Sequence, residues 1–133
     1  MKGIADTGFL VAFLNHRVAH HSWACALAET IEEPLLTVEA VLAEAAFHVE
    51  SVQAVMALIP AGLIQLDFAL HRNIPRVETL AKRYADRSPD LADLCLICLS
   101  EQHPKRPVLT VDGDFLIYRR HQRERIPTVM PSR

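Results

Sequence analysis

Short apolar runs alternate with longer segments of helical periodicity along the whole chain, and this alternation limits the fold more than any other feature. The runs that predict strands are residues 2–5, 35–36, 63–67, 107–111 and 126–129. The segments that predict helices are residues 7–14, 20–33, 37–51, 51–59, 73–87, 90–102 and, as a short helix, 112–120. Strands that alternate with helices form an α/β fold with a mostly parallel sheet. We therefore expect a three-layer α/β/α sandwich around a short, mostly parallel central sheet.

Polar residues near the segment starts predict how several helices begin. Thr7 and Thr37 each stand before a helical pattern and are expected to cap it through their hydroxyls. Ser88 followed by Pro89 is typical of a helix start, because the Ser88 hydroxyl can cap the helix and Pro is favoured at the first helical position. The segment 90–102 is apolar almost all round, so we expect it to be a central, buried helix.

The composition suits one domain over residues 1–133. Half of the residues are hydrophobic and 23% are charged, which supports a sizeable core and excludes a disordered tail. The N-terminal apolar stretch is interrupted early by Asp6, which argues against a signal peptide or a membrane span of about 20 residues. Three cysteines are an odd number and too few for a disulfide scaffold. We expect a cytoplasmic protein in a reducing compartment, with no membrane partner.

The net charge of −2 is unevenly distributed. Residues 1–101 hold 7 Lys+Arg and 13 Asp+Glu, a net of −6, whereas residues 102–133 hold 7 and 3, a net of +4. An acidic body with a basic C-terminal part is compatible with either a polyanion or a protein partner.

Several acids lie where a solvated helix face does not explain them. Asp6 and Asp112 each follow a predicted strand, and the carboxyl ends of parallel strands are where α/β folds place their sites. Asp90 and Asp93 are three residues apart on an otherwise apolar helix, and Glu44 lies between alanines. Carboxylates that converge on one cleft repel each other, so a bound cation or protonation is expected. Hard divalent cations such as Mg²⁺ take oxygen ligands and support phosphodiester hydrolysis.

Structural interpretations compete with this one at single positions. Asp6 or Asp112 alone could be only a helix cap, and Asp90 just after Ser88-Pro89 could only stabilise the helix dipole. Glu39, at the start of its helix, has the same explanation. Asp93 is preferred to Asp90 as a candidate site residue, because helix capping or the helix dipole does not explain an acid inside an apolar helix.

Four segments together resemble the PIN-domain family, and within it the VapC-type toxins of bacterial toxin–antitoxin pairs. They occur in the family's order, and the resemblance extends over essentially the whole chain: IADTGFLVAFLN, LTVEAVLAEAAF, DLADLCLICLSE and VLTVDGDFLIYR. The first and last segments are the most specific, above all T-x-D-x-D-F after a strand.

The resemblance implies roles for particular residues. The family's four conserved acids correspond to Asp6, Glu44, Asp93 and Asp112, which would be the catalytic and metal-binding residues. Auxiliary positions are matched by Thr7, Thr110, Asp90 and Asp114.

The resemblance also implies an activity and partners. It implies a metal-dependent endoribonuclease in which the acids hold Mg²⁺ or Mn²⁺ and an activated water attacks the RNA phosphodiester in line. It further implies a homodimer and a co-encoded antitoxin that inserts a segment near the site. The alternative is a PIN fold that has lost catalysis and acts as a binding module in a protein or RNA complex.

Two basic clusters have both a structural and a functional interpretation. The run 119–125 is either a solvated tail or a contact for RNA phosphates through Arg119, Arg120 and Arg123. The second cluster has the same two interpretations and comprises Arg72, Arg76, Lys82, Arg83 and Arg87.

Other signals are weaker. Cys95 and Cys98 share one apolar helix with no second pair for zinc, which favours core packing. His16 and His20 are four residues apart but lie in an apparent connection, and Trp23 favours core or dimer packing over base stacking. Receiver-like and dehalogenase-like folds are set aside, because the first strand is followed by Asp6-Thr7-Gly8 and Lys105 precedes its strand.

Overall fold

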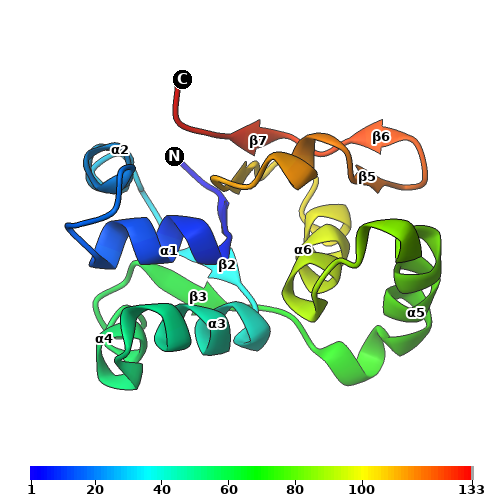
Figure 1. Ribbon diagram of the computed structural model, residues 1–133, viewed down its shortest axis with the longest axis horizontal. Coiled ribbons are helices and arrows are strands. Elements are labelled where there is room, and N and C mark those ends of the chain that lie inside the picture. The colour runs from blue at the N-terminus through cyan, green and yellow to red at the C-terminus, as the bar shows by residue number, and fades with distance from the viewer. Residues whose placement is uncertain (133) are drawn as a thin grey trace.

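A computed structural model describes residues 1–132 and shows a five-stranded sheet with helices packed around it (Figure 1). The strands are β1 Ile4–Ala5, β2 Leu35–Thr37, β3 Ile64–Leu66, β4 Val108–Leu109, β5 Arg119–Arg120, β6 Glu124–Arg125 and β7 Thr128–Val129. The α-helices are α1 Thr7–Leu14, α2 His21–Ala28, α3 Glu39–Val49, α4 Val52–Met56, α5 Ile74–Arg83 and α6 Leu91–Gln102. The 3₁₀ helices are η1 Leu70–Arg72, η2 Ala85–Arg87 and η3 Gly113–Leu116.

The central sheet has the order β3-β2-β1-β4-β7, and its pairings are all parallel. Because β1 and β4 are neighbours, the segments that leave their carboxyl ends also lie side by side. The predicted α/β class with a parallel sheet is confirmed, and β7 occupies the edge predicted for it. A separate antiparallel hairpin, formed by β5 and β6, was not predicted.

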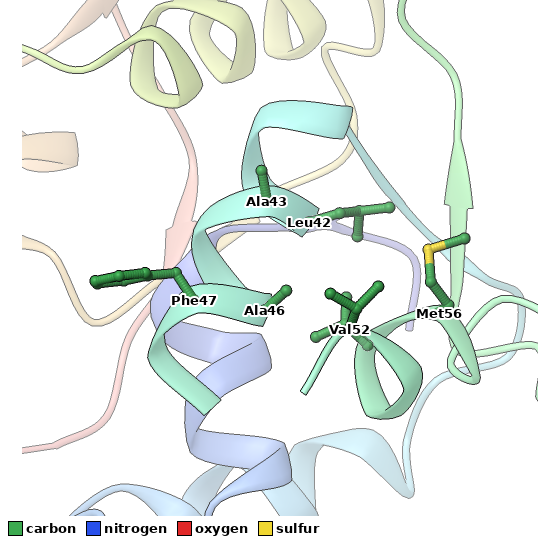
Figure 2. Close-up of a pocket in the computed structure, with 7 residues that line it drawn as sticks. Leu42, Ala43, Ala46, Phe47, Val52 and Met56 are labelled. Carbon is green, nitrogen blue, oxygen red and sulfur yellow. The ribbon is translucent and has the colours of Figure 1, made fainter. Parts of the chain in front are cut away.

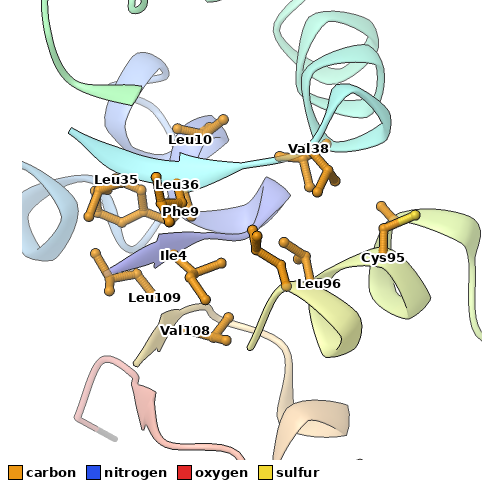
Figure 3. Packing of buried hydrophobic residues seen from close by; sticks show 14 of the residues in the cluster. Ile4, Phe9, Leu10, Leu35, Leu36, Val38, Cys95, Leu96, Val108 and Leu109 are labelled. Carbon is orange, nitrogen blue, oxygen red and sulfur yellow. The ribbon is translucent and has the colours of Figure 1, made fainter. Parts of the chain in front are cut away.

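The core lies between the sheet and the helices. Figure 3 shows strand residues such as Ile4 and Val108 packed with Leu96 of α6, and Phe9 and Leu10 of α1 packed near β2. Nine consecutive residues of α6, Ala92–Ser100, are buried, which confirms the central helix predicted from its apolar composition. Burial on all sides explains why this helix has no polar face.

The helix caps differ from those predicted. Asp6 caps α1 by accepting a hydrogen bond from the Thr7 amide, and Asp90 caps α6 by accepting one from the Asp93 amide. Thr37 is the last residue of β2, where its hydroxyl donates to the Ala5 carbonyl, so Val38 stands at the N-cap of α3. The predicted caps Thr7, Thr37 and Ser88 were therefore wrong. A carboxylate one or two residues away forms the stronger charge-assisted bond at α1 and α6.

Two segment boundaries were also wrong. The helix expected over residues 20–33 ends at Ala28, well before Pro34. The short helix expected over residues 112–120 is one 3₁₀ turn, η3, followed by β5. In the part of the chain that is described, no helix is both long and apolar enough to cross a membrane.

Gly8 allows α1 to start directly beside the chain that leaves β4. A Cβ atom at this position would lie 2.4 Å from Cγ2 of Val111, closer than packed carbon atoms approach. The absence of a side chain at Gly8 therefore lets Asp6, two residues earlier, lie against the end of β4.

Candidate active site

Asp6 and Asp112 are joined through Thr110 at the carboxyl ends of β1 and β4. The Thr110 hydroxyl donates to Asp6 Oδ2 over 2.6 Å, and the Thr110 oxygen accepts from the Asp112 amide over 2.9 Å. The Asp6 amide donates to the Leu109 carbonyl, which sets the two segments in register. Asp6 and Thr110 are both buried, so their bond is shielded from water.

Glu44 reaches the same region from α3. The Thr7 hydroxyl donates to Glu44 Oε2 over 3.1 Å, which links the first turn of α1 to the middle of α3. The α-helical spacing turns Val41, Leu42 and Ala45 into the core and leaves Glu44 partly exposed. A hydroxyl directly after Asp6 thus orients a second carboxylate.

Asp90 and Asp93 arrive on the first turn of α6. Asp93 is buried, and the Tyr118 hydroxyl donates to its Oδ2 over 2.9 Å. Tyr118 is fully buried and held between the rings of Tyr84 and Phe115, so its hydroxyl has a fixed position. The Asp93 position differs from the one expected, because it is the third residue of the helix rather than a mid-helix residue.

Burial, and after it the charges of neighbouring carboxylates, raises the pKa of Asp93, Asp6 and Glu44. Burial raises the pKa of Asp93 to about 8, and the charges of Asp90, Asp6 and Asp112 add to the rise. Burial raises the pKa of Asp6 to about 6, again with contributions from the charges of Asp112 and Asp90. The pKa of Glu44 is also raised, first by burial and then by the charge of Asp90. The charges of Asp90 and Asp112 therefore act on the region that holds Asp6, Glu44 and Asp93.

We call Asp6, Glu44, Asp90, Asp93 and Asp112 the acid cluster. Its donor atoms are all carboxylate oxygens, the ligands that Mg²⁺ and Mn²⁺ prefer. Within residues 1–132, no three His, Cys, Asp or Glu side chains are grouped closely enough to hold an ion as they stand. The donor chemistry nevertheless fits a hard divalent cation, because a bound cation would offset both the burial and the lesser repulsion that raise the pKa values of Asp6 and Asp93.

Asp114 lies at the margin of the acid cluster. Its amide donates to Asp112 Oδ1 over 2.9 Å, and its carboxylate faces Arg87 at 3.5 Å. The structure therefore brings together the acids and hydroxyls selected from the sequence, with Asp114 paired to a cation beside them. The metal-binding role of these residues stays a prediction.

The three arginines selected as RNA contacts lie in different environments. Arg120 is buried, donates to the Ser100 carbonyl and hydroxyl, and pairs with Glu124 at 2.8 Å. Arg119 donates to three carbonyls at the end of η3, including that of Leu116. The side chains of Arg119 and Arg120 thus stabilise the fold, and only Arg123 is exposed.

Sequence reasoning missed Tyr118 as a partner of Asp93. Tyrosine 25 residues after the acid gives no local signal, because the pair is formed only when the segment after η3 packs on α6. Sequence reasoning also preferred Asp93 to Asp90, whereas the charge of Asp90 contributes to the raised pKa of both Glu44 and Asp93. Asp90 is at once a helix cap and a member of the cluster.

Other predicted roles are resolved by burial. Cys95 and Cys98 are buried among the core residues, and burial raises the thiol pKa of Cys95 to about 11 and that of Cys98 to about 12. Both therefore pack in the core as expected. Trp23 packs edge-on against Phe9, with the ring centroids 5.9 Å apart, which agrees with the predicted packing role.

A pocket of about 430 Å³ lies beside α3, and apolar side chains line it (Figure 2). It is lined by Leu42, Ala43, Ala46, Phe47, Val52, Val55 and Met56. Phe47 is 79% exposed and Val52 is 68% exposed, so the pocket opens on an apolar surface. Without a polar group, this pocket offers no chemistry for hydrolysis.

The comparisons with known proteins support the fold. No family model matches the sequence, and no curated protein sequence matches it. Among solved structures, the chain is similar to VapC20 of Mycobacterium tuberculosis, which is described as a toxin that cleaves the sarcin–ricin loop. The match covers 86% of this chain and 92% of VapC20, with a TM-score of 0.72 and 18% sequence identity. The chain therefore has the PIN fold of that toxin.

Proposed function

We propose that this protein is a metal-dependent endoribonuclease and that it acts as the toxin of a toxin–antitoxin pair. The acid cluster at the carboxyl ends of β1 and β4 is the observation that carries the nuclease proposal. The likeness to VapC20 supports RNA as the substrate, and its description as a toxin supports the biological role. A homodimer and a protein antitoxin belong to the same proposal.

The acid cluster would hold Mg²⁺ or Mn²⁺ through Asp6, Glu44, Asp93 and Asp112, with Asp90 beside them. When bound, the cation would activate a water and neutralise charge that develops on the phosphate. Thr110 holds Asp6 and orients the chain at Asp112, whereas Thr7 holds Glu44. Tyr118 holds Asp93, so these three hydroxyls keep the carboxylates in place against their repulsion.

A cleavage assay tests the proposal. The purified protein, free of any partner, is incubated with single-stranded and structured RNA in Mg²⁺, in Mn²⁺ and in EDTA. We expect cleavage with a metal, none in EDTA, and none with Asp6→Asn. Absence of cleavage together with absence of metal binding would contradict the nuclease and favour the non-catalytic binding module.

A further inference from the structure

A second pocket, of about 370 Å³, brings the two basic clusters of the sequence together. It is lined by Arg76, Thr79, Arg83, Gln122 and Arg123, from α5 and from the turn between β5 and β6. The Arg83 guanidinium donates to the Gln122 carbonyl, 39 residues away in the chain. We call this site the arginine pocket.

Glu101 of α6 holds both walls of the arginine pocket in place. Arg76 donates to both Glu101 oxygens, over 2.8 and 2.6 Å, and the His121 amide donates to Glu101 Oε2 over 2.6 Å. The turn itself has a left-handed backbone, with φ of 47° at His121 and 72° at Gln122. The pocket is thus shaped by bonds between α5, α6 and the hairpin.

The positive charge of the pocket is only partly neutralised. Arg76 is paired with Glu101. Arg83 instead contacts two uncharged groups, the Gln122 carbonyl and the Tyr84 ring, whose centroid is 5.4 Å from Arg83 Cζ. Arg123 is exposed. For residues 1–132, no carboxylate lies within ion-pair distance of Arg83 or Arg123.

The donors that remain for a ligand are guanidinium N–H groups. The Thr79 hydroxyl donates to the Pro75 carbonyl over 2.9 Å, so its hydrogen is already used. Two guanidinium groups without acidic partners in a concave site match the oxygens of a phosphate, which arginine binds in a bidentate manner. This chemistry selects a phosphate ester or another polyanion.

A series of neighbouring residues links the arginine pocket to the acid cluster. Arg83 and Arg87 are four residues apart, at the end of α5 and in η2. Arg87 faces the carboxylate of Asp114, whose amide bonds to Asp112. Arg87 of η2 thus connects the end of α5 to the margin of the acid cluster.

We propose that the arginine pocket binds a backbone phosphate of single-stranded RNA, at a position separate from the acid cluster. Arg83 and Arg123 supply the binding charge, and Arg76 with Glu101 shapes the pocket. The choice of RNA among polyanions rests on the proposed function.

Equilibrium binding of a fluorescent single-stranded RNA in EDTA tests this site without cleavage. The double variant Arg83→Gln/Arg123→Gln is compared with Arg17→Gln/Lys105→Gln, which removes the same charge from exposed positions elsewhere. We expect Arg83→Gln/Arg123→Gln to raise Kd about tenfold or more. The slope of the log association constant against log salt concentration should decrease in magnitude by about 0.7, as for one lost phosphate contact. The control is expected to raise Kd less than threefold. Equal Kd values for the two double variants, or no RNA binding by the wild-type protein, would overturn the proposal.

Three further measurements keep the result interpretable. If Arg83→Gln lowers Tm, the exposed Arg123→Glu is compared with Arg17→Glu, and equal Kd values again overturn the proposal. A polyglutamate peptide is titrated in parallel, and variants that lose peptide binding but keep RNA binding would show a protein-docking site instead. Cleavage in Mg²⁺ is measured separately. Pocket-dependent RNA binding without cleavage would contradict only the proposed function, whereas cleavage with pocket-independent binding would contradict only this inference.

Discussion

The acid cluster and the arginine pocket both gather like charges, but they hold them in opposite ways. The acid cluster lies at the carboxyl ends of the inner strands β1 and β4, where Asp6 and Asp93 are buried and their pKa values are raised. The arginine pocket lies at the periphery, where Glu101 neutralises Arg76 and Arg123 faces solvent. The buried acids therefore store unfavourable electrostatic energy that a proton or a cation relieves, whereas the arginines store little. Substitutions in the two sites should accordingly differ in their effect on stability.

The largest expected effect is the loss of activity in Asp6→Asn. The amide keeps the size of the side chain but removes the buried charge, so we expect metal-dependent RNA cleavage to fall at least 100-fold. The same variant should unfold at a higher Tm than the wild-type protein at pH 8 without metal, because it lacks the charge that burial, and then the charges of Asp112 and Asp90, disfavour. Asp86→Asn, at an exposed position of η2, serves as control. An active Asp6→Asn protein, or one with a lower Tm than the wild-type protein, would contradict the role assigned to the buried Asp6 charge.

Next in size is the pH dependence of stability without metal. The pKa of Asp6 in the folded protein is about 6 and that of Asp93 about 8, above the ordinary value of 3.8. The folded state therefore binds these protons more tightly, and the stability that they contribute is lost as pH rises from about 4 to 8. For the buried Asp6, the rise in pKa from 3.8 to about 6 corresponds to a loss of roughly 3 kcal/mol in the free energy of unfolding.

Thermal or urea unfolding between pH 5 and pH 8 in EDTA measures this dependence. We expect stability to fall as pH rises, to fall less in Asp6→Asn, and to be restored at pH 8 by added Mg²⁺. The Arg83→Gln/Arg123→Gln protein should follow the wild-type dependence. A wild-type curve that is flat over this range would contradict the raised pKa values of Asp6 and Asp93.

The prediction for Tyr118→Phe is smaller. Phe keeps the ring that packs with Tyr84 and Phe115 but removes the donor to Asp93 Oδ2. We expect cleavage to fall about tenfold, and the pKa of Asp93 to rise further, because the lost hydrogen bond favoured its charged form. The rate-against-pH profile should shift to higher pH with an unchanged RNA Kd. A tenfold change in Kd with an unshifted profile would show that Tyr118 does not act through Asp93.

The smallest effect is expected for Thr110→Val. Valine has nearly the same shape, but Asp6 Oδ2 loses its donor and the Asp112 amide loses its acceptor. We expect a loss of about 1–2 kcal/mol in the free energy of unfolding, measured by urea denaturation at pH 7. Thr128→Val, on the edge strand β7, is the matched control. Equal losses in the free energy of unfolding would show that the Thr110 bridge does not stabilise the protein more than the Thr128 hydroxyl does.

The sequence predicted the acid cluster better than its surroundings, for a physical reason. Asp6 and Asp112 follow apolar strands directly, and adjacent parallel strands bring such positions together, so a local pattern has a long-range consequence. The Tyr118–Asp93 bond and the two walls of the arginine pocket depend on how the segment after η3 packs on α5 and α6, which no local pattern encodes. Arg120 shows the limit most clearly, because a run of basic residues conceals one arginine that is buried against Ser100 and Glu124.

The most direct test of the acid cluster is to measure Mn²⁺ binding by the isolated protein with isothermal titration calorimetry at pH 7.5. We predict saturable binding that is lost in Asp6→Asn and in Asp112→Asn, that weakens at pH 5.5 as the buried acids take up protons, and that is unchanged in Arg83→Gln/Arg123→Gln. Mn²⁺ binding that is equally strong in Asp6→Asn, or no Mn²⁺ binding by the wild-type protein, would contradict the account.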